Sequence, residues 1–462
     1  MQDALPANKW SVLFITLLAA FLMPFMGSSI NIALPSIGEE FNISAITLSW
    51  IATAFILSVA VFLIPFGRVA DIHGRKKIFI IGMIIYTLGS GLAGISISAG
   101  MLIASRALQG VGSAMFSATA LAILTSVFPK DERGKVLGIN VAAVYLGLSL
   151  GPSLGGLITQ HLGWRAIFLI NIPLCLTIII LALWKISGEW ADAKGEPFDF
   201  PGSLIYGLML ILLMYGFSLL PGIAGAAFIA SSILLAVLFI RREISIPHPV
   251  LNLSLFRNNP VFVFSNLAAL INYSATFGVG FLLSLYLQYI KGYRPVSAGM
   301  VLIAQPIVMT VFSPLAGMLS DRIEPRIVAS LGMALTAAGL FMLSFLNGAG
   351  DLAFVIACLV ILGLGFALFS SPNTNAIMSS VDRKIYGIAS AMVGTMRLLG
   401  QMLSLGLVTL LFALYLGPVK ITPEYHPMFL SCMRTAFLVF AIICFAGIFA
   451  SLVRGKVRDN CP

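Results

Sequence analysis

Long apolar runs are the feature that most restricts what this 462-residue chain can fold into. An α-helix needs about 20 apolar residues to cross a hydrocarbon core about 30 Å thick. Hydrophobic residues make up 59% of the chain and charged residues 10%, against about 45–50% and about 25% in soluble domains. The sequence therefore predicts an all-α polytopic protein that lies within a lipid bilayer.

Short charged loops separate fourteen such runs, and an even number of crossings puts both termini on one side of the membrane. The predicted helices cover residues 10–34, 46–68, 77–96, 99–128, 136–158, 164–186, 202–220, 223–240, 261–289, 296–320, 326–346, 352–371, 385–415 and 429–453.

Basic residues are distributed unevenly between the two sides of this predicted topology. The loops and tails on the side of the termini hold twenty Lys and Arg residues, and the opposite side holds five. Such a bias indicates the cytoplasmic side, so we expect both termini in the cytoplasm and the protein in the plasma membrane. The net charge of +10 is then explained by topology, and no nucleic-acid partner is expected.

The chain repeats itself. "GRVADIHGRKK" at 67–77 returns as "GMLSDRIEPRI" at 317–327, and "GINVAAVYLGLSLG" at 138–151 aligns with "GIASAMVGTMRLLG" at 387–400. The offsets, 250 and 249 residues, predict two six-helix bundles, 1–190 and 257–462, with two additional helices in 191–256. Transporters built from parallel repeats bind substrate between the halves near the midplane.

Two motifs suggest moving parts. In the repeated loop, an acid at a helix end beside an arginine can act as a latch between the halves; a merely solvated loop is the alternative. In "GLSLGPSLGG", glycines four residues apart predict close helix packing, with or without a hinge at the proline. The residues assigned to gating are Gly67, Asp71, Gly74, Arg75, Asp321, Arg322, Gly147, Gly151, Pro152 and Gly155.

"RALQGVGSA" at 106–114 places Arg106 and Gln109 inside an apolar run, and Arg397 lies inside another. An intramembrane arginine costs at least ~2.5 kcal/mol on insertion scales, so it should face the protein interior and have a partner. A role in transport or gating and a structural tie to another helix both remain open.

In these motifs the chain resembles the major facilitator superfamily, and within it the fourteen-helix drug:proton antiporters. "GWRAIFLINIP" at 163–173, "FDFPGSLIYGLMLILLMYG" at 198–216 and "YGIASAMVGTMRLLGQ" at 386–401 carry the likeness further. The resemblance implies alternating access, a glycine-proline helix typical of exporters, and a central cavity lined by the predicted helices 10–34, 99–128, 261–289 and 352–371.

The first helix departs from that family. In "MGSSINIALP", Met26 stands where relatives have an aspartate, while Asn31 is kept. All 17 acids are predicted in loops, tails or helix ends, so the buried carboxylate that binds cations and protons is missing. Two intramembrane arginines without an acid favour anionic, zwitterionic or neutral amphiphiles.

Uncharged polar residues inside the helices complete the candidate site, each with an interhelical hydrogen bond as the alternative role. The substrate or coupling candidates are Met26, Ser28, Ser29, Asn31, Arg106, Gln109, Asn272, Tyr273, Gln305, Asn373, Asn375 and Arg397.

These observations predict a secondary exporter of amphipathic small molecules. Proton antiport, uncoupled transport of an anionic, zwitterionic or lipid-like substrate, and a non-transporting receptor or scaffold remain alternatives. We expect no enzyme, cofactor or metal site, because no nucleotide-binding motif, nucleophile with base, or metal cluster can be assembled. The oligomeric state is open, and a monomer is compatible with the sequence.

Overall fold

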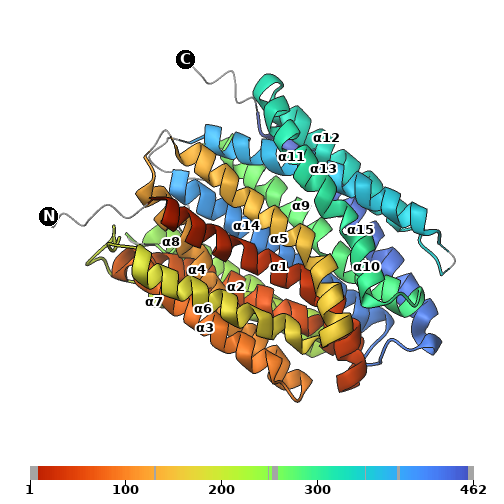
Figure 1. Cartoon of the computed structure of the whole chain (residues 1–462). Helices are drawn as coiled ribbons and strands as arrows, with labels where there is room; N and C mark the ends of the chain where they lie inside the picture. Colours follow the sequence, from red (N-terminus) through yellow and green to blue (C-terminus); the bar gives the residue numbers. More distant parts are fainter. Residues whose placement is uncertain are drawn as a thin grey trace.

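The computed structural model describes residues 9–129, 132–247, 249–251, 259–348, 350–381 and 386–455. Within these ranges fourteen helical segments are long and apolar enough to cross a membrane, which confirms the predicted number of spans and the all-α class. They run side by side across the molecule (Figure 1). The helices are α1 Lys9–Phe41, α2 Ala45–His73, α3 Arg75–Gly94, α4 Ala99–Val127, α5 Arg133–Leu162, α6 Arg165–Lys185, α7 Phe200–Leu219, α8 Ile223–Ser245, α9 Pro260–Leu285, α10 Pro295–Leu302, α11 Ala304–Arg322, α12 Pro325–Leu343, α13 Leu352–Ser379, α14 Tyr386–Tyr415 and α15 His426–Val453.

The tenth span differs from the single uninterrupted helix predicted over 296–320. It divides into α10 and α11, which meet at Ile303. Pro306 explains the break, because it lacks the N–H that would bond to the carbonyl of Leu302 and its ring crowds that carbonyl. The ninth span also ends differently, in a π-helical turn over Tyr286–Ile290.

Helix packing repeats between the first and last six spans. In the first set α1 packs on α5, α2 on α4, α3 on α4 and α3 on α6; in the last set α9 packs on α14, α11 on α13, α12 on α13 and α12 on α15. The glycines repeat as well. Gly112 approaches the backbone of Gly82 as Gly365 approaches that of Gly332. Packing thus repeats with nearly the spacing found in the sequence.

We call the face where α1 begins and α15 ends the terminal face, and the opposite one the distal face. Contacts between the two sets of six concentrate toward the distal face, where α5 meets α10, α2 meets α14 and α1 meets α9. There the Gln288 amide donates to the carbonyl of Ile32 (3.0 Å), and Ala45 N–H donates to the carbonyl of Val419 (3.0 Å). The structure is therefore closed at the distal face.

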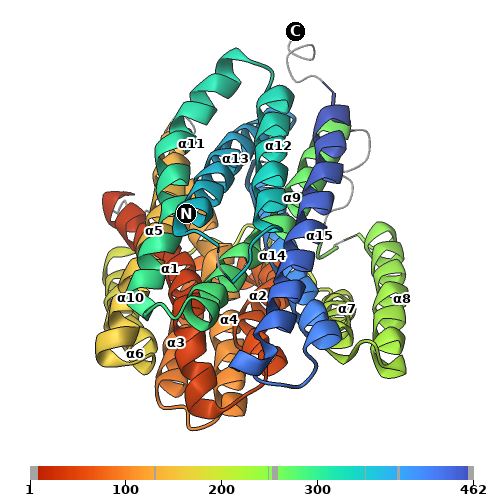
Figure 2. The same cartoon turned by 90° about the vertical axis from the view of Figure 1, so that its right-hand side faces the viewer.

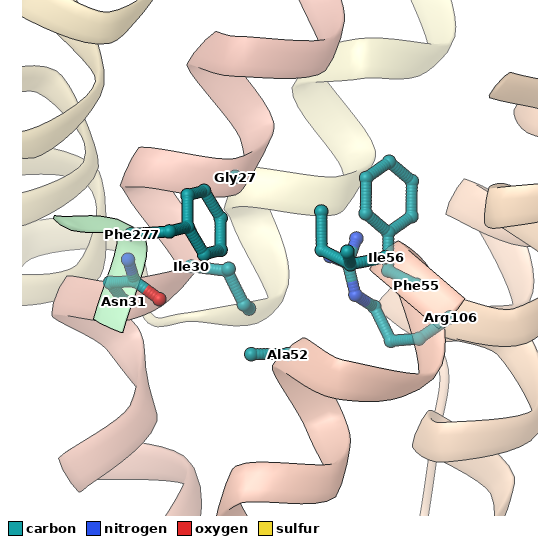
Figure 3. A pocket seen from close by; sticks show the side chains of 8 residues that line it. All are labelled: Gly27, Ile30, Asn31, Ala52, Phe55, Ile56, Arg106 and Phe277. Atoms are coloured by element: carbon teal, nitrogen blue, oxygen red, sulfur yellow. The ribbon is translucent and has the colours of Figure 1, made fainter. Parts of the chain in front are cut away.

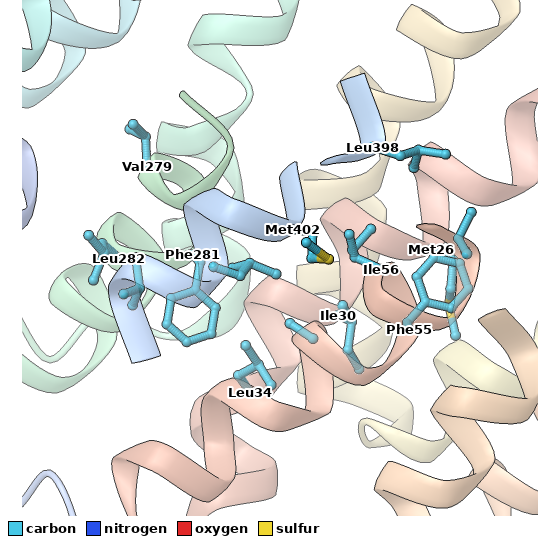
Figure 4. Packing of buried hydrophobic residues seen from close by; sticks show 14 of the residues in the cluster. Met26, Ile30, Leu34, Phe55, Ile56, Val279, Phe281, Leu282, Leu398 and Met402 are labelled. Atoms are coloured by element: carbon cyan, nitrogen blue, oxygen red, sulfur yellow. The ribbon is translucent and has the colours of Figure 1, made fainter. Parts of the chain in front are cut away.

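The buried apolar core is continuous across both sets. Figure 4 shows Met26 and Phe55 of the first set near Leu398 and Met402 of the last. The two additional helices, α7 and α8, lie together at one side of the bundle (Figure 2). There α7 packs against α2 and α14, and α8 packs against α7.

Candidate functional site

A small pocket lies where α1, α2, α4 and α9 converge (Figure 3). Its cavity volume is about 10 Å³, room for roughly one water molecule. A drug-sized molecule would therefore need the pocket to widen. The lining residues are Gly27, Ile30, Asn31, Ala52, Phe55, Ile56, Arg106 and Phe277.

Arg106 is the charged group of this pocket, although its side chain is only 1% exposed. Neutral groups hold it: Nη1 donates to Gln109 Oε1 (2.8 Å), Nε donates to the carbonyl of Ile51 (3.3 Å), and the guanidinium lies 4.2 Å from the centroid of the Phe55 ring. Gln109 in turn donates to Ser90 Oγ (2.7 Å). In the part of the chain that the structure describes, no carboxylate forms a salt bridge with Arg106. The pocket thus carries an uncompensated positive charge.

The candidate residues of α1, Met26, Ser28, Ser29 and Asn31, point in two directions. Asn31 lines the pocket, but the Ser28 and Ser29 hydroxyls turn toward α5, where Ser29 Oγ donates to the carbonyl of Gly151 (3.0 Å). Met26 is fully buried, with its sulfur 3.3 Å from Nδ2 of Asn171. Only one of these four residues, Asn31, therefore borders the pocket in this conformation.

The glycine stripe of α5 explains why α1 and α5 approach so closely. A Cβ on Gly147 would lie 2.6 Å from the carbonyl oxygen of Phe21, and one on Gly155 would lie 2.7 Å from Cα of Ser29. Such contacts leave no room for a side chain. Between them α5 runs without interruption through Pro152.

A second polar group connects α5 with the last six spans. Tyr145 donates to Ser370 Oγ (3.3 Å), and Tyr273 interacts with both Ser370 and Arg397. Arg397 is half-buried. We call these four residues the tyrosine–arginine group. Tyr273 and Arg397 were predicted from sequence, whereas Tyr145 and Ser370 were not, because a contact across 225 residues leaves no local signal.

The remaining amide candidates lie elsewhere. Asn272 is fully buried and neither of its amide atoms has a hydrogen-bond partner among the described residues. Asn373 accepts from Arg454 (2.8 Å), and Asn375 donates to Ser320 Oγ (3.0 Å), so both tie helices together. Gln305 is half-buried at the start of α11. Arg454, buried at the end of α15, was not recognised as a buried arginine from sequence.

The loop between α2 and α3 is held by its own half of the molecule. Arg75 pairs with Asp71 (2.7 Å) and with Asp192 (2.8 Å) of the segment that follows α6. Glu189 accepts from the backbone of Lys76 (2.8 Å) and packs against Gly74, whose φ of +113° suits glycine. In this conformation the loop expected to act as a latch between the halves instead binds residues 186–199 of its own half.

The other gating candidates lie in the two repeated segments, near the ends of α2 and α11. Gly67 faces Ala118 of α4, with 3.8 Å between an added Cβ and the alanine Cβ. Asp321 accepts from Asn375 Nδ2 (3.4 Å) near the end of α11, and Arg322 is the last residue of that helix. Gly67 belongs to the first six spans, and Asp321 and Arg322 belong to the last six.

Comparisons with known proteins agree with this architecture. The sequence model of the Major Facilitator Superfamily, a protein family, matches residues 16–296 and 265–460. The riboflavin transporter RibZ of Clostridioides difficile is 30% identical over 98% of this chain and 99% of its own length. The multidrug resistance protein Stp of Mycobacterium tuberculosis is 30% identical over 87% and 76%. The tetracenomycin C resistance and export protein of Streptomyces glaucescens is 28% identical over 90% and 78%.

Proposed function

The chain belongs to the Major Facilitator Superfamily and is a membrane transporter, and from this premise we propose that it exports amphipathic small molecules by alternating access. The position of the pocket supports this mechanism most directly. It joins α1, α2 and α4 of the first six spans to α9 of the last six, in a structure closed at the distal face. Rocking of the two halves would open that face and expose the pocket there.

The pocket's chemistry supports the substrate class. The positive charge of Arg106, the Asn31 amide and the rings of Phe55 and Phe277 suit a planar aromatic molecule that is neutral or anionic. The guanidinium of Arg106, which has no carboxylate partner among the described residues, would repel an organic cation. The names of the relatives, a riboflavin transporter, a multidrug resistance protein and a tetracenomycin C resistance and export protein, fit this class.

The protein has a preferred orientation in the membrane and needs a driving force for export. The excess of Lys and Arg in the loops at the terminal face supports cytoplasmic termini in the cell membrane, so the structure faces inward. Exchange against protons would supply the energy for export. One copy of the chain holds the whole pocket, so a monomer suffices.

Riboflavin uptake into inside-out proteoliposomes tests the function. Riboflavin should accumulate when the vesicle interior is made acidic, and the accumulation should collapse when an ionophore dissipates the pH gradient. Riboflavin movement that does not depend on the pH gradient would contradict proton antiport and support facilitated transport. Saturable binding without any flux would instead favour a receptor built on a transporter fold.

Substitution of Asp71 tests the loop between α2 and α3. Asp71→Asn should cost less than about 1 kcal/mol of stability, because the ion pair with Arg75 is partly exposed. Transport should fall several-fold, since this loop holds the segment that leads to α7. Riboflavin binding, measured by fluorescence quenching, should stay at the wild-type level. A loss of binding would contradict a conformational role for Asp71.

A further inference from the structure

Two carboxyl groups are buried at the terminal-face ends of α7 and α8. Glu243 lies in the last turn of α8 with 3% of its surface exposed, and Asp199 caps the first turn of α7 with 8% exposed. The sequence predicted a helix only to residue 240, which left Glu243 in a loop. The structure instead extends α8 to Ser245 and turns Glu243 inward.

Hydrogen bonds divide unequally between the two acids. Asp199 accepts from the backbone N–H of Gly202 (3.1 Å) and from Arg242 Nη2 (2.6 Å) and Nε (3.1 Å). Glu243 accepts through Oε2 from Leu251 N–H (2.7 Å), while its buried Oε1 has no partner among the described residues. The two acids therefore share one neighbouring arginine, Arg242, and Arg242 is paired with Asp199.

The unpartnered oxygen borders the neighbouring acid. A Cβ added to Gly202 would overlap Asp199 Oδ2 and would lie 3.0 Å from Glu243 Oε1. The two carboxyl oxygens therefore border the same small space, which a larger residue than glycine would fill. Asp199 and Arg242 are the charged groups that act on Glu243. A buried carboxylate beside another carboxylate is costly, whereas a protonated carboxyl gains an O–H that Asp199 can accept.

We propose that Asp199 and Glu243 form a proton-binding pair, in which Glu243 carries a proton in this conformation and releases it during the transport cycle. This proposal rests on the proposed exporter function, and it makes the Asp199–Glu243 pair the proton site of the antiport. Glu243 changes from carboxylic acid to carboxylate as the proton leaves to water, and Arg242, whose side chain is 35% exposed, moves to pair with it.

The position of α7 links this site to the moving halves. Tyr206 of α7 donates to the carbonyl of Ala60 on α2 (3.1 Å), and Met214 of α7 lies against Gly406 of α14. Because α2 and α14 belong to different halves, their relative motion must displace α7. Among the described residues α8 packs chiefly on α7, and Glu243 is also held by Leu251 N–H beyond α8. Displacement of α7 therefore moves Asp199 relative to the segment that holds Glu243.

Infrared spectroscopy of the purified full-length protein tests the proton directly. At neutral pH the wild type should show the C=O stretch of a protonated carboxylic acid, which disappears on alkaline titration. Glu243→Gln should lose that band. Asp199→Asn frees Arg242 to pair with Glu243. In this variant the C=O band of protonated Glu243 should therefore disappear at a lower pH than in the wild type. The control Glu424→Gln, an exposed acid elsewhere, should keep the band. A band that persists in Glu243→Gln would overturn the proposal.

Transport tests the coupling separately. In inside-out proteoliposomes, Glu243→Gln should reduce gradient-driven riboflavin accumulation to the level without a gradient, while riboflavin exchange at equal pH continues. Undiminished accumulation in Glu243→Gln would refute coupling at this site and leave the exporter function standing. If the wild type moves no riboflavin, the proposed function fails for this probe, and the infrared experiment alone decides the proton site.

Discussion

Arg106→Gln should weaken binding of riboflavin 5′-phosphate about 10- to 100-fold and binding of riboflavin far less. The two flavins share one ring system and differ by a phosphate, so their comparison isolates charge. A hydrogen bond from a charged donor contributes about 1.5–3 kcal/mol, and each 1.4 kcal/mol is about tenfold in affinity. Arg106 has no carboxylate partner within the described ranges. Its charge is therefore available to an anion that widens the pocket.

Two further variants separate charge from structure. Arg106→Lys keeps the charge but loses the bonds to Gln109 and to the carbonyl of Ile51, so it should retain most of the preference for the phosphorylated flavin. Arg434→Gln removes an arginine that donates to the carbonyl of Leu346 (2.6 Å) away from the pocket, and should leave the preference unchanged. Fluorescence titration measures all three. An equal loss for both flavins in Arg106→Gln would assign Arg106 to the fold alone.

The fold could be predicted from sequence because its determinants are local or repeated. Apolar length fixes each span, and the recurrence of the 67–77 segment at 317–327 predicts two similar sets of six helices. The helix pairs α1–α5 and α9–α14 pack in the corresponding way. The break at Ile303 had a local signal as well, in Pro306. A proline alone does not predict a break, because prolines are tolerated inside many membrane helices, such as Pro24 in α1.

The site was only partly predictable, because the orientation of a side chain around a helix depends on its neighbours. Ser28 and Asn31 lie almost one turn apart on α1, yet one turns toward α5 and the other lines the pocket. Arg454 and Glu243 were read as loop or tail residues from hydropathy, and both are buried. Only the packing of distant segments, such as Ser265 and Asn373 around Arg454, reveals this.

Gly299→Val should shift the protein out of this conformation by about tenfold or more. Gly299 of α10 lies against the carbonyl of Pro152 on α5, and a Cβ would overlap that oxygen. A Cβ on Gly156 would likewise lie 2.5 Å from the carbonyl oxygen of Pro295. Overpacking costs about 1–3 kcal/mol, about a tenfold change per 1.4 kcal/mol. This cost falls on the distally closed state alone, because α5 and α10 belong to different halves.

Cysteine labelling from the distal side measures the shift. Ser49 is fully buried and its hydroxyl lies 2.9 Å from that of Thr409 across the two halves. In a background without native cysteines, Ser49→Cys should react about tenfold faster with a membrane-impermeant maleimide when Gly299→Val is present. The control Gly332→Val places its Cβ 2.5 Å from the backbone nitrogen of Phe369 within one half. That clash burdens every conformation, so it should lower thermal stability without changing the labelling rate. Faster labelling in Gly332→Val as well would mean that overpacking loosens the helices generally, and that the contact between α5 and α10 does not hold the distal face closed.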